Sequence, residues 1–221
     1  MNKTVKKILI SLLCVFLALL LAVGSYAAYV LISYSRIEDF LSLEVSPAAE
    51  ENAEIAESVR IGTTYTAVSF NIGFGAYTPD FTFFMDGGKE SRAESKESVI
   101  AHVTSAAETA LSLSPDFALF QETDTSSTRS HHVNERTLIA DVFSSFQSVF
   151  AVNYHSTYLM SPIFEPHGKS NSGILTFSKT AISSAVRRSL PISSSLSKLL
   201  DLDRCYSVSR IPAENGKEFV L

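Results

Sequence analysis

The most prominent hydrophobic feature of the chain is an apolar run over residues 8–32 that contains no charged residue. About 20 such residues in a helix cross the hydrocarbon core of a bilayer. Three lysines precede the run, and Arg36 and Glu38 follow it. The positive-inside rule therefore predicts a cytoplasmic basic tail over residues 1–7, a single-pass transmembrane anchor over 8–32 and an extracellular remainder. A cleaved signal peptide is the alternative, because Ser25-Tyr26-Ala27 resembles a cleavage site, although the apolar run continues past it.

The next segment, residues 33–63, is polar and acidic and shows no periodic apolar pattern. We interpret it as a stalk or linker. A folded domain is expected over residues 64–221, because strand-like alternation and helical spacing then follow one another. The pattern predicts strands at 66–72, 117–121, 147–153, 173–178 and 205–211, helices at 95–113 and 135–146, and a short helix at 194–200.

A long aromatic loop, residues 73–88, separates the first predicted strand from the first helix of this domain. Its rings are expected either to fold into a cluster of their own or to form a lip for substrate. At the other end, Asn215-Gly216 predicts a hairpin turn into a last strand at 218–221. That strand has no exit, so we expect the sequence to be part of a longer protein.

Composition changes the picture in two ways. With 46% hydrophobic and 19% charged residues, the chain is globular rather than disordered. Three of the 18 Lys and Arg residues precede residue 33, whereas all 23 acids follow it, which leaves a net charge of −8 on the remainder. Such an acidic surface is a poor generic binder of polyanions, so a phosphate ligand would need a metal and a local basic spot.

Polar side chains stand at the ends of the first two predicted strands. Asn71 lies near the end of one, and Glu122 directly follows the other. If these strands are parallel neighbours, both side chains emerge at the same rim of a sheet. A carboxylate beside a carboxamide is hard oxygen ligation, suited to Mg²⁺ or Mn²⁺. The alternative is that Glu122 is a solvated loop residue.

Three short sequence words carry a family resemblance: Ser69-Phe70-Asn71-Ile72, Pro115-Asp116-Phe117-Ala118-Leu119-Phe120-Gln121-Glu122 and Asn171-Ser172-Gly173-Ile174-Leu175-Thr176-Phe177-Ser178-Lys179. In this order they resemble the endonuclease/exonuclease/phosphatase superfamily, which includes deoxyribonucleases, inositol-polyphosphate 5-phosphatases and neutral sphingomyelinases. The resemblance implies an α/β fold, a four-layer α/β sandwich of the deoxyribonuclease-like type, here incomplete and preceded by the transmembrane helix.

The resemblance also implies roles for individual residues. Glu122 would bind the catalytic Mg²⁺ (or Mn²⁺), and Asn71 would lie in the same pocket as a further catalytic or metal-binding group. Asn171 would contact substrate, or it is only a turn residue before a strand. Arg204 would contact phosphate, as nuclease members do at this position, or it is a surface arginine.

The family's later words, a strand ending in a catalytic His, an Asp-x-Asn pair and an Asp-His pair, do not occur among the 221 residues. The five histidines do not replace them, although His131 and His132 could line the cleft. We therefore expect this chain to hold part of the metal site without turning over alone. The whole enzyme would be a phosphodiesterase or nuclease at the outer face of a membrane. A lipid phosphoesterase and a catalytically inactive binding module are the alternatives.

Overall fold

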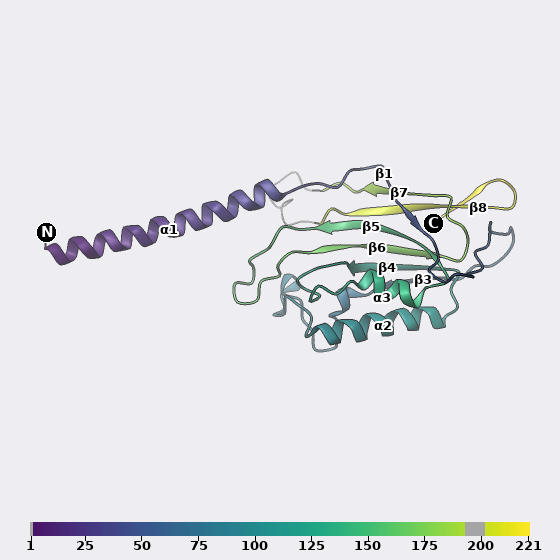
Figure 1. Cartoon of the computed structure of the whole chain (residues 1–221), viewed down its shortest axis with the longest axis horizontal. Coiled ribbons are helices and arrows are strands. Elements are labelled where there is room, and N and C mark those ends of the chain that lie inside the picture. The colour runs from purple at the N-terminus through teal and green to yellow at the C-terminus, as the bar shows by residue number, and fades with distance from the viewer. Residues whose placement is uncertain (1, 193–201) are drawn as a thin grey trace. The chain divides into compact units, whose positions relative to one another are not determined.

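The computed structural model describes residues 2–192 and 202–221 of the chain, which form two separate units, residues 1–35 and 36–221. The first unit is the long helix α1, Lys3–Ser33, with a mean hydropathy of 2.8 over its most apolar window and no buried residue. By length and composition this helix is able to cross a membrane. Its position relative to the folded unit is undetermined (Figure 1).

Helix α2, Lys96–Ser112, shows how the local sequence builds the folded unit. Ser95 caps it, because its hydroxyl accepts a hydrogen bond from the Ser98 amide at 3.0 Å. Its buried side chains follow one face at helical spacing: Val99, Val103, Ala107 and Ala110. The helix stops before Ser114, whose φ of 51° is left-handed and which is followed by a proline. The predicted helix at 95–113 is thus confirmed.

Two sheets form the centre of the unit. The five-stranded sheet has the order β2-β5-β6-β4-β3 and the four-stranded sheet the order β1-β7-β8-β9. The strands are β1 Leu41–Ser42, β2 Val45–Ser46, β3 Ala67–Asn71, β4 Phe117–Asp124, β5 Gln147–His155, β6 Asn171–Ser178, β7 Ser184–Ser189, β8 Cys205–Pro212 and β9 Glu218–Val220.

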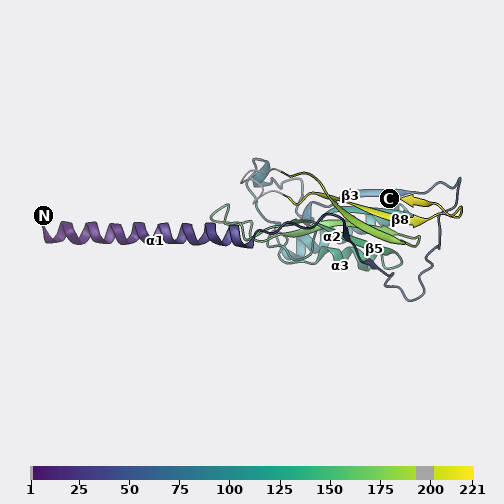
Figure 2. The same cartoon turned by 90° about the horizontal axis from the view of Figure 1, so that it is seen from above.

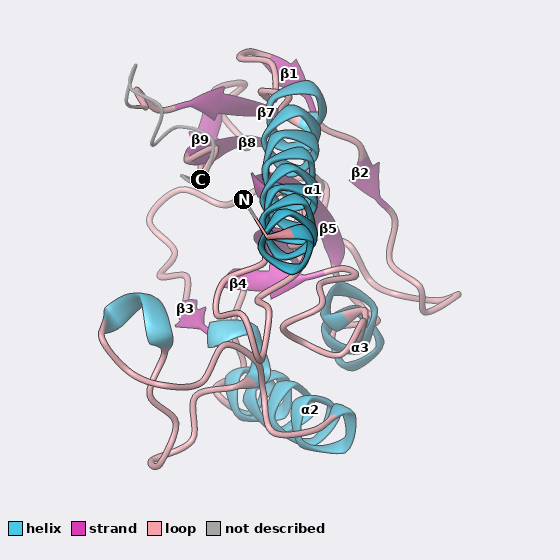
Figure 3. Ribbon diagram, turned by 90° about the vertical axis from the view of Figure 1, so that its left-hand side faces the viewer, coloured by secondary structure: helices cyan, strands magenta, loops and turns pink. Residues whose placement is uncertain are grey.

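The layers are visible end-on in Figure 3, where both α2 and α3, Glu135–Val142, lie on one side of the five-stranded sheet and the four-stranded sheet lies on the other. In the view from above, α2 and α3 lie behind the strands (Figure 2). One core cluster fills the space between helices and sheet, with Phe120, Ile139 and Phe177 at its centre. A second fills the space between the sheets: Val59, Phe117, Val149, Ile182, Ala185 and Ile211. The fold is therefore mixed α/β with two sheets. A further helical layer and the deoxyribonuclease-like fold itself stay predictions.

Segment 36–63 differs from the predicted stalk. Within it, β1 pairs with β7 and β2 pairs with β5, so the chain crosses from one sheet to the other. Val59 is buried in the core between the sheets. The sequence did not predict this role, because edge strands of two residues leave almost no alternation of apolar and polar positions and the segment is rich in acidic residues.

The other strand predictions hold within a few residues, and the hairpin into β9 is present, with β8 and β9 antiparallel. Helix α3 is shorter than the predicted 135–146 and ends at Val142, because Phe143 and Phe146 turn inward to the core instead. The predicted short helix at 194–200 lies outside the described residues. Two 3₁₀ turns, η1 Gly73–Gly75 and η2 Phe84–Asp86, belong to the aromatic loop.

Candidate functional site

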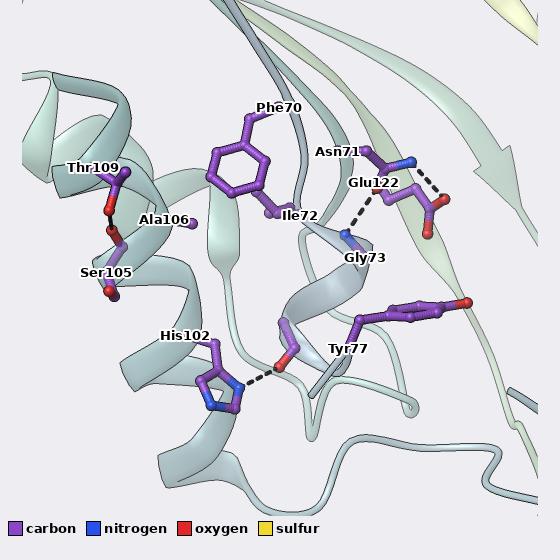
Figure 4. A pocket seen from close by; sticks show the side chains of 11 residues that line it. Phe70, Asn71, Ile72, Gly73, Tyr77, His102, Ser105, Ala106, Thr109 and Glu122 are labelled. Atoms are coloured by element: carbon purple, nitrogen blue, oxygen red, sulfur yellow. Dashed lines mark hydrogen bonds between the residues drawn. The ribbon is translucent and has the colours of Figure 1, made fainter. Parts of the chain in front are cut away.

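Asn71 and Glu122 lie next to each other, as the strand pattern predicted. Strands β3 and β4 are parallel neighbours, with Asn71 paired to Gln121. The Asn71 Nδ2 donates to Glu122 Oε1 at 3.0 Å, while the Asn71 Oδ1 accepts from the Gly73 amide at 2.9 Å (Figure 4). The Asn71 carboxamide is thus held at both ends, with its nitrogen toward the carboxylate.

The backbone of Glu122 is unusual for a residue with a side chain. Its φ is 56°, in the left-handed region, and the pairing of β4 with β6 shifts register between Phe120 and Thr123. A left-handed residue with a side chain costs about 1–2 kcal/mol. The β-bulge at this position turns the Glu122 side chain away from the direction that regular alternation along β4 would give it. Strain of this kind, held by the surrounding structure, is found most often at functional sites.

Glu122 and Tyr77 border two cavities at this rim. The first, of about 630 Å³, lies between α2 and the β3–η1 segment (Figure 4) and is lined by Phe70, Asn71, Ile72, Gly73, Gly75, Tyr77, His102, Ser105, Ala106, Thr109 and Glu122. The second, of about 290 Å³, is lined by Tyr77, Phe83, Met85, Asp86, Glu122, Arg129, Asn153, Tyr154, His167, Ser172, Leu202 and Arg204. The second cavity differs from the first in its charged lining, because the guanidinium groups of Arg129 and Arg204 lie in its wall.

A buried charge cluster supports the strand end behind Glu122. Arg129 donates to both carboxylate oxygens of Asp124, at 2.8 and 3.0 Å, and its guanidinium stacks 4.0 Å over the Phe74 ring. Burial, the largest single influence, lowers the pKa of Arg129, but the charge and hydrogen bonds of Asp124 together with the charge of Glu122 raise it overall. The pair is therefore a fixed ion pair whose cation forms part of the wall of the second cavity.

Glu135, at the start of α3, completes this cluster. Its Oε2 accepts from the Asp124 amide at 2.7 Å, and the side chain is fully buried. Burial raises the pKa of Glu135 well above its usual range, and the Asp124 charge adds to the effect. Both influences disfavour the ionised form of this carboxyl group, which is buried beside a carboxylate already paired with Arg129.

His167 closes the other side of the second cavity. It is buried, with Nδ1 3.2 Å from the Ser91 carbonyl oxygen and Nε2 3.1 Å from the Ser170 hydroxyl. The carbonyl can only accept, so Nδ1 carries the proton of a neutral ring. Burial lowers the pKa of His167 to about 4, and the Arg129 charge contributes. The ring is a neutral structural group rather than a cation at physiological pH.

The donor set decides which metal could fit. Within residues 2–192 and 202–221 there is no group of three or more His, Cys, Asp and Glu side chains that could hold an ion. Glu122 offers a single carboxylate, and the Asn71 oxygen is engaged with Gly73. Mg²⁺ in proteins usually keeps several waters and is held by one or two carboxylates plus substrate phosphates, so one carboxylate is the part of such a site that these side chains could supply.

The remaining sequence candidates divide into two groups. Arg204 lines the second cavity together with Glu122. Asn171, the first residue of β6, lines neither cavity, and its Nδ2 donates to the Thr125 hydroxyl at 2.9 Å. His131 likewise lines neither, and its Nε2 bonds to the Ala93 carbonyl oxygen at 2.7 Å.

Several lining residues were missed by sequence reasoning. His102, Asn153 and Tyr154 come from a helix and a strand whose patterns explain them as ordinary surface or core positions. Only the fold brings them to Glu122. The aromatic loop forms mainly a cluster of its own, with Phe74, Phe81 and Phe83 in ring contact, while Tyr77 and Met85 reach the cavities.

Comparison with known proteins adds no relative. No family model matches the sequence, and no curated protein and no solved structure matches it.

Proposed function

We propose that the chain carries the metal-binding part of a metal-dependent hydrolase of phosphate esters, of the phosphodiesterase or nuclease type. The observation that carries the proposal is Glu122: a carboxylate on a strained, left-handed backbone, oriented by Asn71 and facing two cavities. Glycine adopts this backbone conformation without the steric cost that glutamate bears, so the carboxylate is kept here at some expense of stability. The family resemblance of the surrounding sequence words supports the same function.

Each residue has a distinct role in this proposal. Glu122 holds Mg²⁺ or Mn²⁺, which neutralises charge on the phosphoryl oxygens when it is bound. Asn71 is a positioning residue, because its nitrogen faces Glu122 and its oxygen faces Gly73. Arg204 contacts the phosphate from the wall of the second cavity. The acidic surface makes this local guanidinium necessary.

The proposal includes a location. Helix α1 anchors the protein in a membrane as a single span, with the N-terminus in the cytoplasm and the folded unit outside. The charge-free stretch of α1 and the three lysines before it support this orientation.

Metal binding by the whole chain in detergent micelles tests the proposal. Glu122→Gln is expected to remove at least about tenfold of the Mn²⁺ affinity, because the amide carries no charge, while the thermal midpoint stays the same. Electron paramagnetic resonance of free Mn²⁺ measures the binding. Glu108→Gln, at an exposed position of α2, is the matched control. Equal Mn²⁺ binding by Glu122→Gln and the unchanged chain would contradict the assignment.

Activity is the second readout. The catalytic His and Asp motifs of the family do not occur among the 221 residues, so metal binding rather than turnover is the test of the proposal for this chain. Mg²⁺-dependent hydrolysis of DNA, RNA, phosphoinositides and sphingomyelin then ranks the substrate classes. Metal binding without hydrolysis of any of them would favour the binding module.

A further inference from the structure

The most exposed large apolar side chains of the folded unit stand together in one loop. Ile163 is 83% exposed and Phe164 102% exposed, and the other apolar side chains described in this unit are more covered. We call these two residues the apolar tip. Neighbouring exposed apolar residues of this size mark surfaces that meet another apolar phase or partner.

The apolar tip is presented by a well-bonded base. The Ser91 hydroxyl donates to the Glu165 carbonyl oxygen at 2.6 Å, and the Arg92 Nε donates to the Pro166 carbonyl oxygen at 2.8 Å. His167 packs its ring against Phe83 and Phe84. The tip is therefore exposed on a loop whose base is fixed by hydrogen bonds to the segment around Ser91 and Arg92.

The tip lies at the same end of the fold as Glu122. Strand β4 is antiparallel to β6, and β6 is antiparallel to β5, so β4 and β5 run in the same direction, as Figure 1 shows. The segment with the tip leaves the end of β5, and Glu122 stands at the end of β4. His167, three residues after Phe164, lines the second cavity together with Glu122.

The chain also enters the folded unit at this end. The Arg187 guanidinium donates to the carbonyl oxygens of Val152, near the end of β5, and of Glu38, near the start of the unit, at 2.8 and 3.0 Å. Only two residues separate Ser33, the last of α1, from Arg36, which already bonds to the Leu190 carbonyl oxygen at 3.2 Å. Extended chain allows these two residues to span at most roughly 11 Å.

These observations favour a lipid surface as the partner that contacts the apolar tip. The two residues between α1 and Arg36 tether this end of the folded unit to the helix proposed to span the membrane. The folded part is acidic, with a net charge of −8 beyond residue 32, so attraction to anionic headgroups cannot supply the contact. Insertion of apolar side chains at the level of the headgroups can do so.

We propose that Ile163 and Phe164 dock into the lipid interface of the membrane and hold the Glu122 rim at its surface. Resting on the proposed function, this names the substrate class: the phosphate ester of a membrane lipid rather than a dissolved nucleic acid. Docking is insensitive to salt, because it uses no ion pairs.

A single fluorescent reporter tests the docking. The chain contains no tryptophan, so Phe164→Trp introduces one without background. In the full chain reconstituted into phosphatidylcholine nanodiscs, bromine-labelled lipid is expected to quench most of the emission at position 164, and the maximum shifts to shorter wavelength. Added salt is expected to change neither effect.

Ile61→Trp is the matched control. Ile61 is 59% exposed, and its amide bonds to Glu214, just beyond the far end of β8. We expect no quenching there. Quenching at both positions, or at neither, would overturn the proposal.

The double variant Ile163→Asp, Phe164→Asp separates docking from the proposed function. In the full chain, Mn²⁺ binding by this variant is expected to stay at the level of the unchanged chain, while any Mg²⁺-dependent hydrolysis of lipid in bilayers is expected to fall. Loss of Mn²⁺ binding on Glu122→Gln with quenching intact supports both proposals. If Mn²⁺ binds nowhere but position 164 is quenched, the docking stands and the metal function fails.

Discussion

The carboxamide of Asn71 can be oriented in only one way that satisfies both of its neighbours. The Gly73 amide can only donate and the Glu122 carboxylate can only accept, so the oxygen faces Gly73 and the nitrogen faces Glu122. Sequence reasoning correctly brought the two side chains together, because parallel strands end at one rim. It could not tell a metal ligand from a positioning residue, since that depends on which end of the amide the η1 turn engages.

Asn71→Ala should therefore weaken metal binding without abolishing it. We expect the Mn²⁺ affinity to fall by about 10–100-fold, as is typical when an outer partner of a metal ligand is lost. Gln121→Ala is the control, because the Gln121 Nε2 points to the Ser69 hydroxyl and the Leu119 carbonyl oxygen instead. A titration that shows the same loss for both variants would assign the effect to the strand rather than to Asn71.

At the scale of elements, the predicted helices and long strands follow from periodicity, whereas β7 does not. Its residues, Ser184–Ser189, carry two adjacent arginines and little apolar alternation. Arg187 is nevertheless fully buried, because its guanidinium donates to three backbone carbonyl oxygens and to the Ser189 hydroxyl. A strand stabilised by one satisfied buried cation leaves no hydrophobic pattern to find.

The interlocked loops around His167 give the fold a predicted pH response. The pKa of this group is about 4 in the folded protein and 6.5 ordinarily, so the unfolded chain binds the proton more tightly. The contribution of the neutral His167 ring to the free energy of unfolding is fully present above pH 6.5 and is lost as the pH falls from 6.5 toward 4.

His167→Gln is expected to flatten that dependence, measured by urea unfolding across this pH range. His155→Gln, at an exposed position at the end of β5, should leave it unchanged. Parallel pH curves for the unchanged chain and His167→Gln would show that the ring does not carry the effect.

For the whole molecule, the division into two units sets the consequences of truncation. Residues 36–221 contain both sheets and both cores, so removal of residues 1–35 should leave the urea midpoint unchanged. Starting the chain at residue 64 removes β1, β2 and Val59, whose burial alone contributes about 1.5–3 kcal/mol. We expect a clear fall in the midpoint for 64–221. Equal midpoints for the two truncations would restore the stalk interpretation.

The left-handed backbone of Glu122 also affects which substitutions are expected at this position during evolution. Single-base changes from a glutamate codon reach glycine, which would relieve the backbone, and aspartate, which tolerates it and keeps a carboxylate. Drift without selection for the carboxylate therefore has a stabilising path away from glutamate. A lineage that no longer needs the proposed metal binding is therefore expected to change first at this codon, and a comparison of natural variants would show glycine or aspartate there before any change in the core.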